Sequence, residues 1–281
     1  MKPIRLFIGS DFHCGHEVGL TPPAWNPKYD MPELQRMSDY RAYLWDKFSS
    51  GIAQFMPFDV GIFNGDLIDG RGAKIGGTEA IFVDREDQCR MASDVIKFVG
   101  AQENYITRGT DYHVGEIESW ENLIAKETNS NRIGDILKIN IRGLRLNVRH
   151  HISTSQVPHT RATALLREWL WDALWSDAQE EYSRADVIIR SHAHYHISVS
   201  QPGMLAMILP GLQGYGTRYG ERRLAGMIHF GFVVMDVVSK EDFSWQAKTY
   251  HFPLPPETVV SIGSLPPNPL TSPQPTLTVY G

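Results

Sequence analysis

The sequence predicts a mixed α/β fold, and three observations support this prediction. Up to about residue 195, short apolar runs of strand length alternate with longer segments in which apolar residues recur at helical spacing. The opening strand is followed by a helix and then by a second strand, which is the pattern of a βαβ unit. Beyond residue 200 the pattern changes to consecutive strands, which predicts an antiparallel region.

Each element is predicted from its own local pattern. Strands are predicted where apolar or alternating runs end at turn-forming or polar residues, namely 4–10, 60–63, 104–107, 144–148, 187–189, 204–209, 229–238 and 243–252. Helices are predicted at 32–55, 79–99, 120–126 and 161–175. Pro32 suits the first turn of its helix. The helix at 161–175 is amphipathic, and its apolar residues are Leu165, Leu166, Trp169, Leu170 and Leu174.

Length and composition indicate one large domain with an appendage. The chain has 281 residues, of which 42% are hydrophobic and 21% charged, and it is long enough to bury a full core. We expect residues 1–252 to form the domain. Residues 253–281 are rich in proline and poor in charge, so we expect an extended tail or a partner-binding arm there.

Charge and cysteine content exclude several classes of protein. The net charge of −5 argues against a broad clamp on a nucleic-acid backbone, although it allows a local basic pocket for one phosphate. No apolar run reaches membrane-spanning length, so we expect no membrane association. Cys14 and Cys89 are expected to be free thiols, and the N-terminal residues lack a signal-peptide pattern. We therefore expect a cytoplasmic location.

Side chains that bind metals follow five successive predicted strands. Asp66 comes just after the strand at 60–63, and the carboxyl ends of strands are where α/β sheets bind ligands. The other four strand ends carry Asp11 with His13, Thr110 with Asp111 and His113, His150 with His151, and His192 with His194. A single histidine at a strand end is usually structural. Five successive strands that each end in Asp or His are hard to explain by packing, because each buried polar group would need its own partner.

This set of side chains predicts a pair of metal ions. Imidazole and carboxylate together suit manganese, iron, zinc or nickel, whereas an all-oxygen set would suit magnesium or calcium. About seven ligands are too many for one tetrahedral ion, but two ions that share a carboxylate would use them all. We expect Asp66 to be the shared ligand, with manganese as the first choice of metal and iron, zinc or nickel as alternatives.

The same segments resemble the successive motifs of the calcineurin-like metallophosphoesterase family. The family motifs are Asp-x-His, Gly-Asp-x-x-Asp, Gly-Asn-His-Asp/Glu, a lone His and Gly-His-x-His. They stand here as Asp11-Phe12-His13, Gly65-Asp66-Leu67-Ile68-Asp69, Gly109-Thr110-Asp111-Tyr112-His113, His150 and Ser191-His192-Ala193-His194. The match in order and spread covers about residues 4 to 200.

The resemblance implies a fold and an assignment of metal ligands. The implied fold is a four-layer α/β/β/α sandwich, and the strands after residue 200 fit its second sheet. One metal would be held by Asp11, His13, Asp66 and His194. The other would be held by Asp66, His150 and His192.

The chain departs from the family pattern at two places. Thr110 stands where the family has its Asn ligand, so Thr110, Asp111, His113 or a water would complete the second metal, which we expect to bind with reduced affinity. The resulting Gly-Thr-x-x-His motif is similar to that of family members from phages and prophages, and a phage-encoded protein would act in the host cytoplasm. In the doublet at 150–151 only one histidine can face the metals, because side chains alternate along a strand. We favour His150 and expect His151 to face the substrate or to support a ligand.

The expected chemistry is hydrolysis of a phosphate ester. A hydroxide that bridges the two metals would attack phosphorus, with Asp66 holding both ions. His113 is the candidate general acid for the leaving oxygen, or else it is itself a metal ligand. Arg108 and Arg149 lie beside ligands and would bind phosphate oxygens, unless each is paired with an acidic residue outside the site.

The sequence therefore predicts a dinuclear phosphoesterase. Its substrate would be a phosphodiester, such as a small nucleotide or a nucleic-acid end, or a phosphomonoester. The alternative is a non-catalytic scaffold that keeps the fold as an interaction platform. Such a protein is expected to have lost ligands, and here nearly all are present.

Overall fold

The computed structural model describes residues 1–71, 78–115, 119–155, 157–179, 184–216 and 228–250. The predicted tail at 253–281 lies outside these residues. Within them, no helix is both long and apolar enough to cross a membrane.

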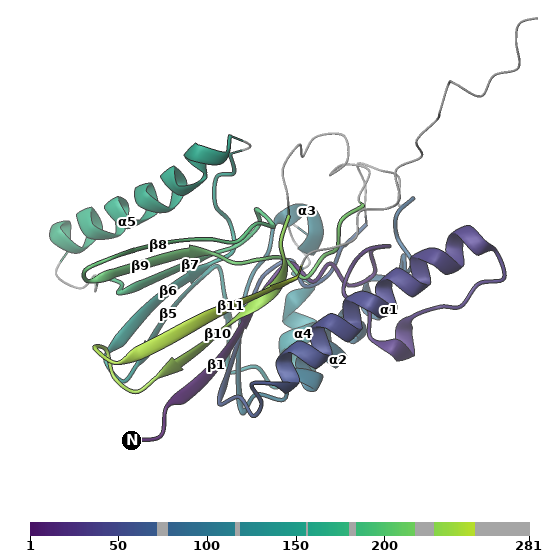
Figure 1. The fold of residues 1–281 in the computed structure, drawn as a ribbon, viewed down its shortest axis with the longest axis horizontal. Coiled ribbons are helices and arrows are strands. Elements are labelled where there is room, and N and C mark those ends of the chain that lie inside the picture. The colour runs from purple at the N-terminus through teal and green to yellow at the C-terminus, as the bar shows by residue number, and fades with distance from the viewer. Residues whose placement is uncertain (72–77, 116–118, 156, 180–183, 217–227, 251–281) are drawn as a thin grey trace, which may run out of the picture.

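Two β-sheets form the centre of the molecule (Figure 1). The first sheet has the strand order β11-β10-β1-β2-β3-β4, and its strands are β1 (Ile4–Gly9), β2 (Val60–Asn64), β3 (Glu103–Thr107), β4 (Arg132–Gly134), β10 (Phe230–Val237) and β11 (Phe243–Tyr250). The second sheet has the order β5-β6-β7-β9-β8, and its strands are β5 (Ile136–Ile141), β6 (Leu144–Arg149), β7 (Val187–Arg190), β8 (Ile197–Gln201) and β9 (Met204–Ile208).

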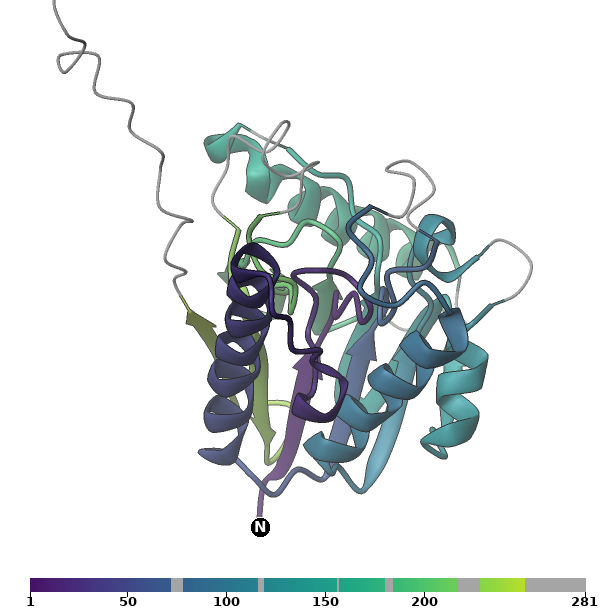
Figure 2. The same cartoon turned by 90° about the vertical axis from the view of Figure 1, so that its right-hand side faces the viewer.

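Helices cover the outer face of each sheet. They are α1 (Pro32–Ala53), α2 (Arg85–Val99), α4 (Glu121–Glu127) and α5 (Arg161–Ala178), whereas the one-turn helix α3 (Asp111–Val114) lies beyond the end of β3 (Figure 1). Figures 1 and 2 show α1, α2 and α4 on one side of the paired sheets, and Figure 1 shows α5 on the other. The fold is thus a four-layer α/β/β/α sandwich, as the family resemblance implied.

Alternation along the strands separates three buried clusters. On β1, Phe7 points to the helices α1 and α2, while Leu6 and Ile8 point to the second sheet. The layer between the sheets is apolar from both sides. A third cluster lies under α5, where Leu165 packs on the outer face of β7 and β9.

Strand direction brings the predicted ligand segments to one end of the sandwich. The strands β1, β2 and β3 pair in parallel, and so do β6 and β7 in the second sheet. Their carboxyl ends therefore lie at common edges, which is where every predicted ligand segment begins.

The structure corrects several boundaries and pairings. The second helix begins at Arg85 and not at residue 79, because the Asp84 side chain caps it by accepting a hydrogen bond from Glu86 N. It ends at Val99 and is capped by Gly100, whose φ of 65° is left-handed. The strands β4, β5 and β8 and the short helix α3 were not predicted.

The expected antiparallel region is divided between the two sheets. The strand β9 joins the second sheet and pairs in parallel with β7, whereas β10 and β11 form an antiparallel hairpin in the first sheet.

The aromatic cluster around Phe7 predicts a stability difference. Phe7 is fully buried, and the centroid of its ring lies within 6.2 Å of the ring centroids of Phe48, Phe58, Phe63 and Phe232. We expect Phe7→Ala to lower the free energy of unfolding by about 3–5 kcal/mol in urea titration, because it leaves a cavity that the packed rings cannot fill.

The control is Phe98→Ala. Because the Phe98 side chain is 42% exposed, this variant should lose clearly less free energy of unfolding. Equal losses for the two variants would contradict the assignment of the core.

Candidate metal centre

The loops after β1 and β2 run side by side at the carboxyl edge of the first sheet. Asp11 N donates to Gly65 O at 3.0 Å, and His13 N donates to Asp66 O at 3.0 Å. These two backbone hydrogen bonds hold two ligand-bearing loops in a fixed register.

The second sheet contributes its own loops to the same place. Ser191 N donates to His150 O at 2.8 Å, and His192 N donates to the Asp11 carboxylate at 3.3 Å. Asn64, at the end of β2, donates to Ser191 Oγ at 2.5 Å. The two sheets are therefore joined by hydrogen bonds at the end where the predicted ligands lie.

Three groups of side chains in the described residues have ligand atoms within 4.8 Å of one another. They are Asp11 with His13 and His194, Asp66 with His150 and His192, and His13 with Asp69 and His113. The first two groups bring together six of the seven side chains predicted as metal ligands. The seventh, Thr110, donates from its N and Oγ1 to Asp66 Oδ1, at 2.7 and 3.1 Å.

Asp66 belongs to the group with His150 and His192 and is 1% exposed. Its Oδ2 lies 2.9 Å from His150 Nε2. Burial alone would raise the pKa of Asp66, but the charges of His150 and His113 outweigh burial and hold this pKa well below its ordinary value. Burial lowers the pKa of His150, but the Asp66 and Asp11 carboxylates outweigh it and raise this pKa to about 10. The Asp66 and Asp11 carboxylates therefore favour the protonated, positively charged form of His150.

The buried carboxylate of Asp11 is incompletely satisfied. Its Oδ1 is fully buried and lies 3.2 Å from His194 Nε2, but it makes no hydrogen bond among the described residues. His150 Nε2 likewise makes no hydrogen bond there, although it lies 2.9 Å from Asp66 Oδ2. Buried polar atoms are normally paired, so unpaired carboxylate and imidazole atoms that face one another fit a cation site.

The backbone is strained at the same residues. Eight non-glycine residues in the described part of the chain have positive φ, and five of them are Asp11, His13, Asp66, His192 and His194. Such a conformation is disfavoured for residues with a Cβ, and it concentrates where the structure serves a function.

Two glycines make the close approach possible. A Cβ at Gly65 would lie 2.6 Å from the His150 ring, and one at Gly109 would lie 2.1 Å from Asp66 Oδ1. The glycines that precede Asp66 and Thr110 are therefore required by space.

Asp69 orients two histidines of the third group. Asp69 Oδ1 lies 3.3 Å from His13 Nδ1, and its backbone O lies 2.7 Å from His113 Nδ1. A histidine held at Nδ1 presents its Nε2 to a metal or a substrate. Burial, with the charge of His113, lowers the pKa of His13 to about 4, so His13 is in the neutral form that binds metals.

The predicted substrate-binding residues lie farther out. His151 is exposed, and its ring stacks on that of His192 with the centroids 5.0 Å apart. Arg108 pairs with Asp135 at 3.3 Å, and Arg149 pairs with Glu168 at 2.5 Å. Each arginine is thus engaged by an acidic residue, which is the alternative that the sequence left open.

Glu121 supports the site and was not predicted. It is fully buried at the start of α4, and its carboxylate accepts hydrogen bonds from Gly109 N at 2.9 Å and Leu67 N at 3.3 Å. Burial is the main cause that raises the pKa of Glu121 to about 7, and the nearby Asp66 adds to it. No sequence pattern signals this role, because glutamate is common in the first turn of any helix.

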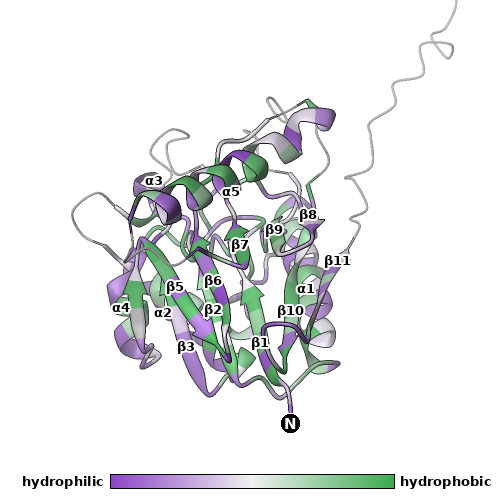
Figure 3. Ribbon diagram, turned by 90° about the vertical axis from the view of Figure 1, so that its left-hand side faces the viewer, coloured by the Kyte–Doolittle hydropathy of each residue, from purple (hydrophilic) through white to green (hydrophobic). Residues whose placement is uncertain are grey.

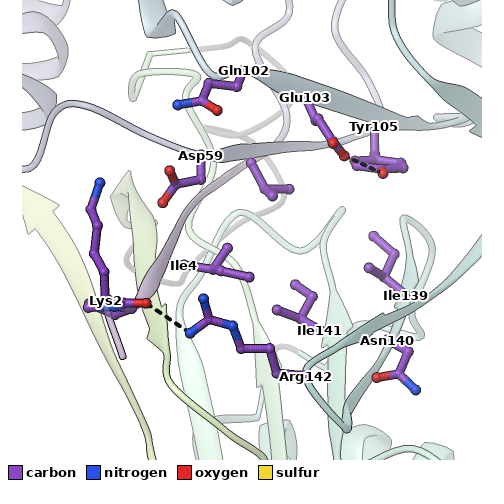
Figure 4. Close-up of a pocket in the computed structure, with 12 residues that line it drawn as sticks. Lys2, Ile4, Asp59, Gln102, Glu103, Tyr105, Ile139, Asn140, Ile141 and Arg142 are labelled. Atoms are coloured by element: carbon purple, nitrogen blue, oxygen red, sulfur yellow. Dashed lines mark hydrogen bonds between the residues drawn. The ribbon is translucent and has the colours of Figure 1, made fainter.

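A cavity of about 380 Å³ lies at the opposite end of the sandwich (Figure 4). It is lined by residues at the amino ends of β1, β2 and β3 and by the turn between β5 and β6. Its polar groups are partly paired, since Arg142 donates to Lys2 O and Tyr105 donates to Glu103. None of the predicted ligands lines it, so the clustered ligands define the candidate site.

No protein-family model matches the sequence, and no curated protein matches it. Solved structures that are similar to this chain include three proteins. An archaeal phosphodiesterase is 14% identical, with a TM-score of 0.44 over 87% of this chain and 99% of its own. Vps29 of Entamoeba histolytica complexed with zinc is 11% identical, with a TM-score of 0.42 over 87% and 98%. A predicted phosphoesterase of Streptococcus pneumoniae is 8% identical, with a TM-score of 0.35 over 88% and 99%. Likeness at this level carries no argument about activity.

The two backbone contacts of Glu121 predict the effect of an isosteric change. In Glu121→Gln, an amide N–H replaces one acceptor oxygen and faces a backbone N–H that is then left unpaired. We expect the free energy of unfolding of the metal-free protein to fall by about 1–3 kcal/mol in urea titration.

Glu86→Gln is the matched control, because the Glu86 side chain is 58% exposed and makes only a surface ion pair with Arg90. If Glu121→Gln were as stable as this control, the two hydrogen bonds would not support the site.

Proposed function

We propose that this chain is a metal-dependent phosphoesterase with two divalent cations at the clustered ligands. The observation that carries the proposal is the convergence of buried Asp and His side chains from both sheets, where Asp11 Oδ1 and His150 Nε2 make no hydrogen bond among the described residues. Asp11, His13 and His194 would hold one cation, His150 and His192 the other, and Asp66 would contribute to both. Manganese is the first choice for this mixture of ligands, with iron, zinc or nickel as alternatives.

The bound cations would supply a water of lowered pKa as nucleophile and would neutralise charge on the phosphate. The protein's own contribution is the placement of these ligands. Backbone hydrogen bonds fix the loops of Asp11 and Asp66 relative to each other, and Thr110 donates to the Asp66 carboxylate. Such prior organisation lowers the cost of ordering the site when it binds.

His113 is the proposed general acid. Its Nδ1 is held by the backbone oxygen of Asp69, which leaves Nε2 for the leaving oxygen of the substrate. The His113 side chain is 18% exposed, so a substrate can reach it. His151 is exposed beside His192 and is the proposed contact to the substrate, and Arg108 and Arg149 would contribute only if they left their acidic partners.

The proposed substrate is a phosphodiester of small size, such as a nucleotide or a nucleic-acid end, with a phosphomonoester as the second choice. The net charge of −5 supports a small substrate over a long nucleic acid. Turnover of bis-p-nitrophenyl phosphate with added manganese, and little turnover of p-nitrophenyl phosphate, is the expected result. No turnover of either compound by the metal-loaded protein would contradict the proposal and favour a non-catalytic scaffold.

Replacement of the shared carboxylate tests the site directly. Asp66→Asn should lower kcat for bis-p-nitrophenyl phosphate by at least about 1,000-fold, because the amide cannot balance the charge of two cations. Metal content measured by inductively coupled plasma mass spectrometry should fall as well. Asp46→Asn, on the exposed surface of α1, is the control and should leave both kcat and metal content unchanged. Full activity of Asp66→Asn would exclude Asp66 from the site.

Replacement of His113 separates an acid from a ligand. For a phosphodiester with an alkoxide leaving group, His113→Ala should lower kcat by about 100-fold or more and leave metal content unchanged, because the leaving oxygen loses its proton donor. The loss should be smaller for bis-p-nitrophenyl phosphate, because its p-nitrophenolate leaving group needs no proton. Loss of metal from His113→Ala would contradict the assignment and make His113 a ligand.

A further inference from the structure

The outer face of α5 is strongly apolar. Five large side chains of this helix are between 39% and 55% exposed, namely Leu166, Leu170, Trp171, Leu174 and Trp175. Figure 3, viewed from the side on which α5 lies, shows apolar residues along this helix. We call these five residues the α5 stripe.

The face of α5 that meets the sheet is held by both apolar and polar contacts, since Leu165, Ala164 and Trp169 pack in the third cluster. Only Leu165 and Asp172 of this helix are buried. The Asp172 carboxylate accepts hydrogen bonds from Asn147 Nδ2 at 3.0 Å and Ala185 N at 2.7 Å, and Glu168 pairs with Arg190 at 3.0 Å. These contacts attach α5 to its own sheet without the α5 stripe, which is a second apolar face of the helix.

We propose that the α5 stripe is the interface between two copies of this chain, related by a two-fold axis. Leu166, Leu170 and Leu174 form one row at a spacing of four residues, and Trp171 and Trp175 form the next. Rows of this spacing on two helices interlock at a crossing angle of about −50°. The same surface then serves both chains, as a two-fold axis requires, with Leu170 and Trp171 at its centre.

The apolar area is sufficient for a dimer. Because about half of each of these large side chains is exposed, the α5 stripe offers on the order of 500 Å² per chain, against the 150–250 Å² that one aromatic residue buries. Two copies would bury about 1,000 Å² from the stripe alone, which is the lower bound for a specific interface. Tryptophan is also the residue most enriched at interface hot spots.

The charges beside the stripe do not oppose a second copy. Arg167 continues the row of Trp171 and Trp175, and it would meet the partner near the axis. Its guanidinium donates to Ser153 Oγ at 2.9 Å, so it is held toward the loop before α5 and away from the row.

A membrane fits this face less well than a second copy. Membrane-surface helices are rich in Lys and Arg beside the apolar face. The charged residues of α5 are of both signs, namely Arg161, Arg167, Glu168, Asp172 and Asp177. The chain as a whole carries a net charge of −5.

Analytical ultracentrifugation of the full chain between about 1 and 100 µM tests the proposal. We expect a reversible dimer, and we expect Leu170→Glu to weaken it by at least about 100-fold, because it buries an unpaired charge at the centre of the interface. Val83→Glu is the matched control, since Val83 is 72% exposed and lies outside α5, and it should dimerise as the unaltered chain does. Circular dichroism and thermal unfolding should show that Leu170→Glu is folded.

A cross-link locates the axis independently. Leu170→Cys should give a disulfide-linked dimer under mild oxidation, whereas Val83→Cys should not. The two native cysteines are buried and will not interfere.

Each other result would overturn the proposal. A monomer at 100 µM would mean that the stripe is covered by something else, such as residues 251–281. A dimer that survives Leu170→Glu would use another surface, and binding of the monomer to anionic vesicles would indicate a membrane surface. None of these measurements depends on catalysis, so the proposed function and the proposed dimer can fail separately.

Discussion

The structure depends on the burial of two carboxylates, Asp11 and Asp66, at the junction of two sheets. A buried carboxylate is costly unless positive charge or hydrogen-bond donors surround it. Here the compensating groups come from both sheets, with His150 2.9 Å from Asp66 and His194 3.2 Å from Asp11. The requirement to neutralise these carboxylates therefore links the sheets at one end, while the apolar layer between them links the rest of their length.

The geometry of this junction is maintained by the backbone. The same part of the structure contains strained φ angles at five candidate ligands, close approaches at Gly65 and Gly109, and the hydrogen bonds that Glu121 accepts from two loops. Strain of this kind persists only where the surrounding structure over-determines the conformation. The scaffold thus stabilises an arrangement that the loops alone would not adopt, which is what the proposed site requires.

The sequence predicted what depends on local pattern and failed where a feature depends on tertiary contacts. Parallel strands that end in Asp or His were visible because the alternation of apolar runs and polar ends is local. The supporting role of Glu121 could not be predicted, because its partners Gly109 N and Leu67 N belong to loops that are distant in the sequence. The strand β5 was missed because Ile136 and Leu137 are both apolar, although only Leu137 is buried, so the alternation is broken. The spacing in α5 predicted the helix correctly, but spacing alone does not say what covers its apolar face.

The proposed site would enclose two cations around Asp66 with side chains from four strand ends, those of β1, β2, β6 and β7. Anomalous diffraction from crystals grown with manganese measures this directly. The account predicts two anomalous peaks, one beside Asp11, His13 and His194 and the other beside His150 and His192, with the Asp66 carboxylate next to both. Crystals without a peak at these side chains, or with the metal bound elsewhere on the molecule, would contradict it.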